Sequence, residues 1–481
     1  NPKDVLTRDQ RKRFDEAKTS FDKPVIIVTQ EEAEAKEKEK ATKTATWEFH
    51  AENVRDFAFA TSRKFIWDAQ AVKLENNTPL AMSFYPKEGN PLWEKESTLA
   101  VKNTLETYSK YTIEYPYPVA ISVHAASIGM EYPMICFNFG RPNPDGSYSD
   151  RTKYRMIGVI IHEVGHNFFP MIINSDERQW TWMDEGLNTF VQYRTEQEQY
   201  EDFPSRRGPA AAITRYMKGD KKYIRPIMTN SEQIMQFGSN AYAKPATALN
   251  ILRETVMGPE LFDKAFKTYA QRWAFKHPKP ADFFRTMEDA SAVDLDWFWR
   301  GWFYSVDHVD IAVKDVKWYR MRSEEVDIEN KAKQVEKGDL AKAEEEGTMD
   351  FGDEPLPFSL IETDDRYYGE FMNRVDDQAI IEKFADKNFY QIQFENEGGL
   401  VMPLIIEFTF TDGSKEIKKI PAEIWRYTEK EVVKTFGFEK EVTKIVLDPN
   451  LETADTDTED NVFPRKKSSS KFDEFKEDAG E

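Results

Sequence analysis

The pentapeptide His-Glu-Val-Gly-His at residues 162–166 constrains this chain more than any other feature. Residues 154–161, directly before it, are mostly apolar, so the motif is expected on a buried helix. On a helix, His162 and His166 lie one turn apart and project from the same face. Buried imidazoles are costly without partners, so the fold must bring other polar groups to this face.

The residue types around the pentapeptide predict a zinc site. Two neutral imidazoles one helical turn apart can take two corners of a tetrahedral zinc ion. Glu185 can supply a third protein ligand and leave the fourth position open, which distinguishes catalytic from structural zinc sites. Glu163 is the candidate general base for an attacking water. We therefore expect one zinc ion per chain, bound by His162, His166 and Glu185. The alternative is that His162 and His166 are ordinary helix residues. It is less favoured because the chain has only six histidines and two of them lie in this pentapeptide.

Two more segments accompany the zinc pattern. Residues 129–133 read Gly-Met-Glu-Tyr-Pro, and residues 240–245 read Asn-Ala-Tyr-Ala-Lys-Pro. Together with the histidine motif, they resemble in order the motifs of the M1 family of gluzincin zinc metallo-aminopeptidases. The resemblance runs from about Trp47 to Tyr304 and continues more weakly through the C-terminal part.

The family resemblance implies a role for each matched residue. It implies that Gly129, Met130 and Glu131 bind the substrate, with Glu131 pairing with the free α-ammonium group. It also implies that Tyr242 donates a hydrogen bond to the oxyanion of the transition state. Without the resemblance, Glu131 reads as an ordinary turn residue, and composition does not select Tyr242 among twenty tyrosines.

Three positions depart from the family pattern. Tyr132 stands where asparagine is usual, Pro245 where glycine is usual, and Asp184 where asparagine often precedes the ligand glutamate. None of these changes removes a reacting group, although Tyr132 can alter the hydrogen bonding offered to a substrate backbone.

The apolar patterning predicts a multidomain α+β protein. Strands are indicated at residues 24–29, 47–50, 119–123, 134–137 and 404–410, the last followed by an Asp412-Gly413 turn, and helical spacing begins at Leu99. We expect the C-terminal part of an N-terminal β domain (1–95), a thermolysin-like, mainly α-helical catalytic domain (96–305), a β-sandwich (306–452) with a charged insert (321–355), and an acidic, disordered tail (453–481).

Charge and cysteine content limit the classes of partner. A net charge of −20 argues against nucleic acids and anionic membranes as main partners. The family resemblance implies peptide substrates. No run approaches the roughly 18 apolar residues of a membrane helix. Cys136 is the single cysteine, which excludes an intrachain disulfide but leaves the compartment open between the cytoplasm and a bacterial periplasm or envelope.

The resemblance also implies a missing element of the substrate site. In M1 enzymes the N-terminal β domain supplies a second side chain that holds the substrate ammonium, and that domain is expected to extend upstream of Asn1. We therefore expect an upstream segment or a partner chain to complete the site.

Two other functions stay open. A thermolysin-like endopeptidase would use the same zinc chemistry, and Glu131 separates the two readings because a carboxylate there favours free N-termini. A scaffold or assembly subunit that retains the fold is the alternative outside enzymes. Intact Glu163 and Tyr242 count against a scaffold, which needs neither a general base nor an oxyanion donor.

Overall fold

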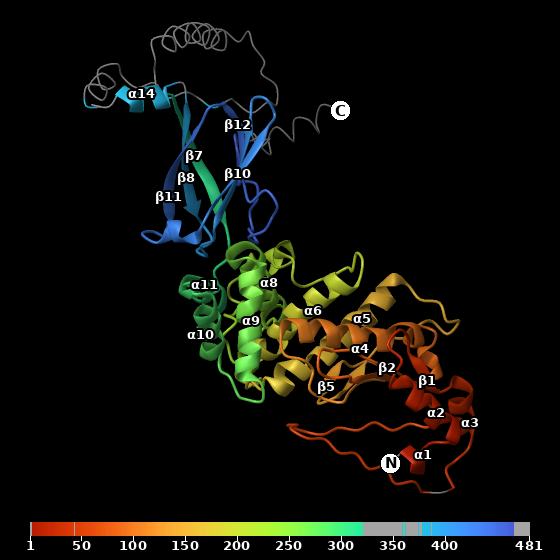
Figure 1. Ribbon diagram of the computed structural model, residues 1–481. Helices are drawn as coiled ribbons and strands as arrows, with labels where there is room; N and C mark the ends of the chain where they lie inside the picture. Colours follow the sequence, from red (N-terminus) through yellow and green to blue (C-terminus); the bar gives the residue numbers. More distant parts are fainter. Residues whose placement is uncertain are drawn as a thin grey trace. The chain divides into compact units, whose positions relative to one another are not determined.

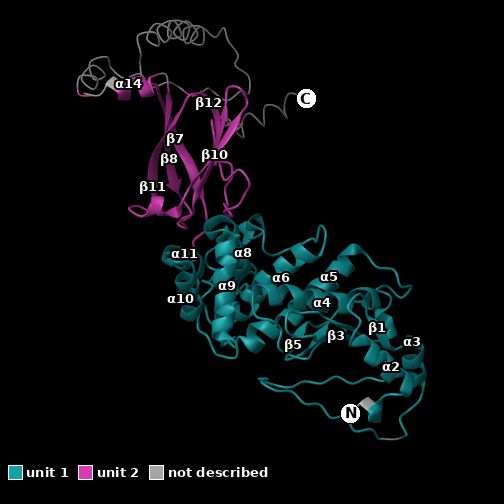
Figure 2. Cartoon of the chain, viewed as in Figure 1, with its two compact units in different colours: residues 1–306 teal, residues 307–481 magenta. Residues whose placement is uncertain are grey.

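The computed structural model describes residues 2–42, 44–320, 378–385 and 387–465, and the single residues 358, 361 and 374. The chain divides into two compact units, Asn1–Val306 and Asp307–Glu481 (Figure 2). Unit 1 contains one sheet and most of the described helices, and unit 2 consists mainly of strands (Figure 1). Within the described ranges, no helix is both long enough and apolar enough to cross a membrane.

A six-stranded sheet forms the N-terminal part of unit 1. Its order is β1-β2-β3-β4-β6-β5, in which β3–β4 and β4–β6 are parallel and the other pairs are antiparallel. The strands are β1 (Val25–Val28), β2 (Ile66–Ala71), β3 (Leu80–Tyr85), β4 (Val119–His124), β5 (Met130–Tyr132) and β6 (Ile135–Asn138). The strands expected at 119–123 and 134–137 are confirmed as β4 and β6, and the edge strand β5 carries Glu131.

Helices cover this sheet and build the rest of unit 1 (Figure 1). They are α1 (Pro2–Val5), α2 (Arg8–Ala17), α3 (Gln30–Lys38), α4 (Leu92–Tyr111), α5 (Asp150–Gly165), α6 (Leu187–Gln199), α7 (Thr214–Met217), α8 (Lys244–Ile251), α9 (Pro259–Trp273), α10 (Pro280–Ser291) and α11 (Asp296–Tyr304). The helix expected from Leu99 begins earlier, at Leu92. α4 packs on β3 and on α5, so it joins the sheet to the helix that carries the histidine motif.

Close packing holds α5 in place. Ser149 caps its first turn, with the hydroxyl accepting a backbone N–H. Near its end, a Cβ on Gly165 would lie 2.2 Å from Asn188 Oδ1 and 2.3 Å from the Tyr108 hydroxyl. Tyr108 donates to Asn188 Oδ1 (2.7 Å), and Asn188 Nδ2 donates to the backbone oxygen of His162 (2.8 Å). The missing side chain at Gly165 therefore allows α4, α5 and α6 to meet where the motif lies.

The expected strand at residues 47–50 does not form. The described residues between α3 and β2 form an extended loop without helix or strand (Figure 1). Trp47 is 57% exposed and Phe49 is 64% exposed. A strand needs a neighbouring backbone to take its hydrogen bonds, and no described strand pairs with this loop. Alternation alone was therefore a misleading signal here.

The expected boundary between residues 95 and 96 does not separate two sheets. β3, before it, pairs in parallel with β4, after it, and α4 runs across the position. The first break in compactness comes only at Val306. The β-rich N-terminal residues of this chain thus share one sheet with the segment that carries Glu131.

The described residues of unit 2 form two sheets, ordered β10-β9-β12-β13 and β11-β8-β7. Its elements are β7 (Ile311–Arg320), α14 (Gln378–Phe384), β8 (Asn388–Asn396), β9 (Leu404–Phe410), β10 (Lys415–Ile420), β11 (Glu431–Phe438), β12 (Val442–Leu447) and β13 (Val462–Phe463). Side chains from the two sheets meet: the rings of Phe408 on β9 and Phe438 on β11 have centroids 4.7 Å apart. The turn expected at Asp412-Gly413 joins β9 to β10, and Gly413 adopts a φ of 80°.

Part of the expected acidic tail belongs to the fold. Thr453 and Asp455 are buried, Asp455 forms a bridge with Val309, and β13 pairs with β12. The prediction of disorder was wrong for residues 453–465, because these residues are partly buried and pair with other backbone segments despite their acidic composition. The charged insert at 321–355 and residues 466–481 lie outside the described residues.

Candidate active site

Segments far apart in the chain meet at the C-terminal end of α5. The candidate residues come from four elements: His162 and Glu163 from α5 and His166 from its C-cap, Glu185 from the helical turn η3 (Trp182–Gly186), Tyr242 from the helical turn η6 (Gly238–Ala243), and Glu131 from β5. Burial differs among them. His162, Glu163 and His166 are buried, whereas Glu131 and Tyr242 are half-buried.

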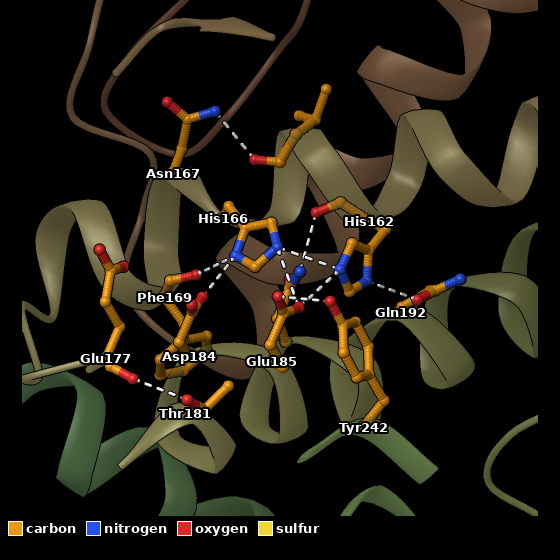
Figure 3. Close-up of polar contacts among 12 residues, drawn as sticks. His162, His166, Asn167, Phe169, Glu177, Thr181, Asp184, Glu185, Gln192 and Tyr242 are labelled. Atoms are coloured by element: carbon orange, nitrogen blue, oxygen red, sulfur yellow. Dashed lines mark hydrogen bonds and ion pairs between the residues drawn. The ribbon is translucent and has the colours of Figure 1, made fainter. Parts of the chain in front are cut away.

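Three donor atoms form a small triangle (Figure 3). His162 Nε2 lies 3.0 Å from His166 Nε2 and 3.0 Å from Glu185 Oε2, and His166 Nε2 lies 3.4 Å from the same oxygen. Tetrahedral ligands bound at the usual distances from zinc are roughly 3.3–3.5 Å apart. The triangle therefore has nearly the size that a zinc ion requires.

The other ring nitrogens determine where the imidazole protons lie. His162 Nδ1 lies 2.9 Å from Gln192 Oε1, and His166 Nδ1 lies 2.8 Å from the backbone oxygen of Phe169. Both oxygens only accept hydrogen bonds, so each Nδ1 carries a proton and donates. In neutral rings, the two Nε2 lone pairs then face each other and a carboxylate. Such an arrangement is stable only around a cation or a shared proton, and the donor set fits zinc.

The surrounding charges favour a positive charge at this point. Burial lowers the pKa of His166, but Asp184 and the neighbouring glutamates outweigh burial and raise it well above its usual value. Burial, together with repulsion from Glu185, raises the pKa of Asp184 to about 8, and His166 opposes that shift. Burial also raises the pKa of Glu185, but His166 and His162 outweigh it and hold the pKa below its usual range.

The candidate base lies next to the candidate ammonium ligand. Burial raises the pKa of Glu163 to about 8, His166 lowers it, and Glu131 adds to the rise. A Cβ on Gly129 would lie 2.4 Å from Glu163 Oε1, so this glycine permits the close approach of β5 to α5. A carboxylate oxygen of Glu131 lies within 4.8 Å of a ring nitrogen of His166. Met130 is 38% exposed.

Tyr242 points at the carboxylate of Glu185 (Figure 3). Its hydroxyl donates to Glu185 Oε1 at 2.6 Å, and its ring stacks on His162 with centroids 5.6 Å apart. The Arg207 guanidinium lies over the Tyr242 ring, 4.4 Å from its centroid. Burial, with repulsion from Glu185, raises the pKa of Tyr242, so the phenol stays a neutral donor at physiological pH.

A cavity of about 380 Å³ adjoins the ligand carboxylate. Its lining includes Glu185, Asp184, Glu177 and Phe237. Acidic groups outnumber basic ones in this lining, and Glu177 is paired with Arg55 at 3.2 Å. The triangle of donor atoms is therefore next to a space that can hold side chains of a bound peptide.

Two residues of the site were missed from the sequence. Gln192 lies on α6, two helical turns beyond Glu185. Residues at this spacing share one face of a helix, so the spacing could have indicated Gln192 from the sequence. Arg207 lies in a loop between α6 and α7, and no spacing rule connects it to Tyr242. Only the tertiary structure brings that guanidinium to the phenol.

Residues 97–302 match the family profile described as Peptidase family M1 domain. Among curated relatives, Probable aminopeptidase 2 of Sulfurisphaera tokodaii is 24% identical over 212 residues, which covers 42% of this chain and 27% of that protein. Aminopeptidase N of Lactococcus lactis is 21% identical over 247 residues, covering 48% of this chain and 29% of that protein. The chain thus spans less than a third of the length of these relatives.

Among solved structures, Legionella pneumophila aminopeptidase A in complex with aspartic acid aligns with a TM-score of 0.50 at 11% identity. The alignment covers 81% of this chain and 38% of that one. At this identity the likeness concerns the fold alone, and it agrees with a multidomain α+β architecture.

Proposed function

We propose that the chain, whose residues 97–302 match the peptidase family M1 profile, is a zinc-dependent peptidase that removes N-terminal residues from peptides. The observation that carries this proposal is the pair of imidazole Nε2 atoms, 3.0 Å apart and facing Glu185. We propose one zinc ion per chain, held by His162, His166 and Glu185. Relatives named as aminopeptidases support the same activity here.

The residues around the triangle divide the chemistry among them. Zinc, when bound, supplies a Lewis acid for a peptide carbonyl. Glu163 accepts a proton from the attacking water and hands it to the leaving amine. Tyr242 donates a hydrogen bond to the oxyanion as charge develops there, and it remains uncharged while doing so.

Glu131 supports an aminopeptidase over a thermolysin-like endopeptidase. It adds a carboxylate beside Glu163, on the edge strand next to the site. A substrate ammonium can form a charge-assisted hydrogen bond there, whereas an acetylated N-terminus cannot. Gly129, Met130 and Glu131 together form the proposed substrate strand, and Gly129 leaves room for a peptide backbone.

The domain layout and the partner are parts of the same proposal. We propose a thermolysin-like catalytic domain at 96–305 and a β-sandwich at 306–452. The division at Val306 supports the second boundary, and the continuous sheet across residues 95 and 96 counts against the first. We also propose that a further segment or a partner chain supplies a second group for the substrate ammonium, because Glu131 is half-exposed and a single wet ion pair contributes little.

Metal analysis and a panel of aminoacyl amides test the proposal in wild type and Glu163→Gln. We expect about one zinc per chain in both proteins, and turnover lower by about 10³-fold or more in the variant, since an amide cannot accept the proton. Absence of zinc from the wild type would reject the proposed site. Zinc without turnover in the wild type, also with N-blocked peptides, would favour the scaffold alternative.

A further inference from the structure

The two imidazoles of the triangle have unlike partners on their far sides (Figure 3). Among the described residues, the hydrogen-bond partner of His162 Nδ1 is the neutral amide oxygen of Gln192, at 2.9 Å. His166 Nδ1 meets the Phe169 backbone oxygen at 2.8 Å and also the carboxylate of Asp184, whose Oδ1 lies 2.9 Å away. At Nδ1, His166 therefore has a carboxylate beside it, whereas the hydrogen-bond partner of His162 is a neutral amide.

The neutral partner is held as a neutral acceptor. Gln192 Nε2 donates to the backbone oxygen of Gly158 at 3.2 Å and to Glu196 Oε1 at 2.7 Å. Because the amide nitrogen is used in this way, the amide oxygen must face His162. Gln192 thus determines the tautomer of His162 but adds no charge to it.

The charged partner is buried. Asp184 is 5% exposed, and its Oδ1 has no hydrogen bond of ordinary geometry among the described residues. A buried carboxylate is costly unless an opposite charge stabilises it. The Phe169 carbonyl already accepts the Nδ1 proton, so Asp184 is not needed to set the tautomer of His166. What Asp184 adds at this point, in its ionised form, is negative charge.

We infer that Asp184 is a positioning residue whose charge strengthens zinc binding through His166. This inference rests on the proposed function. A carboxylate next to Nδ1 makes the imidazole a stronger donor at Nε2 and offsets part of the charge of the ion. The ion in turn favours the ionised form of Asp184.

Asp184→Asn tests the inference because it keeps the shape of the side chain and removes its charge. We expect zinc affinity to fall by about 10–100-fold, the usual effect of losing an outer-shell partner. The readout is the zinc dissociation constant, measured by competition with a chromophoric chelator. Glu232→Gln is the matched control: Glu232 lines the same cavity but is half-exposed and pairs with Arg178, so we expect less than a twofold change.

A second variant keeps the test decisive if the asparagine protein folds poorly. In Asp184→Ala, formate should restore zinc affinity, whereas formamide, which has the same size without the charge, should not. The unfolding temperature of the metal-free proteins controls for general damage. Wild type that binds no zinc would reject the proposed function. Wild type that binds zinc while Asp184→Asn binds it equally well, or rescue by formamide, would overturn this inference alone.

Discussion

The donor triangle of unit 1 and a carboxylate cluster of unit 2 look alike at first. In each, three metal-ligand side chains bring one atom apiece within 4.8 Å of the others. The first set is His162, His166 and Glu185, and the second is Asp310, Glu397 and Asp460. Distance alone does not distinguish them, so the difference must come from the chemistry of the donor atoms and their neighbours.

The neighbours differ in kind. In unit 1, fixed Nδ1 protons leave two Nε2 lone pairs facing a carboxylate. In unit 2, the groups are carboxylates that can take up protons: burial, with repulsion from Asp310 and other acids, raises the pKa of Asp460 to about 6. Basic groups also lie close, since Lys314 is 3.8 Å from Glu397. Close donor atoms indicate a zinc site when they cannot hydrogen-bond to one another. The unit 2 carboxylates can instead reduce their mutual repulsion by taking up protons or by pairing with Lys314.

The largest expected effect separates the two sets directly. His166→Ala should lose nearly all bound zinc, because two ligands rarely hold the ion. Glu397→Gln should leave the zinc content unchanged at about one per chain. Metal analysis of the two purified variants checks this. Equal zinc loss in both, or none in either, would mean that the contrast between the two regions is wrong.

The next prediction concerns Tyr242, the oxyanion donor proposed beside the triangle. Tyr242→Phe should lower kcat by about 10²–10³-fold with little change in KM, since the hydroxyl acts in the transition state. Steady-state kinetics on an aminoacyl amide, with zinc content measured in parallel, tests it. A variant with wild-type kcat would remove Tyr242 from the assignment.

A smaller effect is expected at the substrate strand. Glu131→Ala should lower kcat/KM for peptides with a free N-terminus by about 10–100-fold, the worth of one charge-assisted hydrogen bond. The acetylated form of the same peptide should be affected far less. If both peptides lost activity equally, the ammonium role would fail and the endopeptidase alternative would gain.

The smallest effect is a pH dependence in unit 2. The folded pKa of Asp460 is raised to about 6 from the model-peptide value of 3.8, so the folded state binds the proton more tightly. The free energy of unfolding should therefore fall as pH rises from about 4 to about 6. Asp460→Asn lacks this loss, and above pH 6 it should be more stable than wild type by less than about 1 kcal/mol, because the side chain is partly solvated.

Urea unfolding at pH 4 and pH 8 measures that difference. We expect the two proteins to coincide at the lower pH. A calcium-dependent rise in wild-type stability that Asp460→Asn loses would show that the cluster binds a cation after all, and would weaken the comparison.

The local part of the site was predictable because helical spacing is a local property. The positions of His162, Glu163 and His166 on one buried helix follow from the period of the helix and the apolar run before it. The helix α4 and the strands β4 and β6 were predictable for the same reason. The loop at 44–64 was not, since its apolar alternation is genuine but no described strand takes its hydrogen bonds.

By itself, the sequence determined the donor types, their spacing on α5 and the family resemblance of the segments around them. Only the tertiary structure decided which groups complete the site: Gln192 on one imidazole, Asp184 on the other, and Arg207 beside Tyr242. The same holds for the acids of residues 453–465, which pack into unit 2 although their composition indicates a solvated tail. Charges and hydrogen-bond partners act through space, and residues that meet in space can be far apart in the chain.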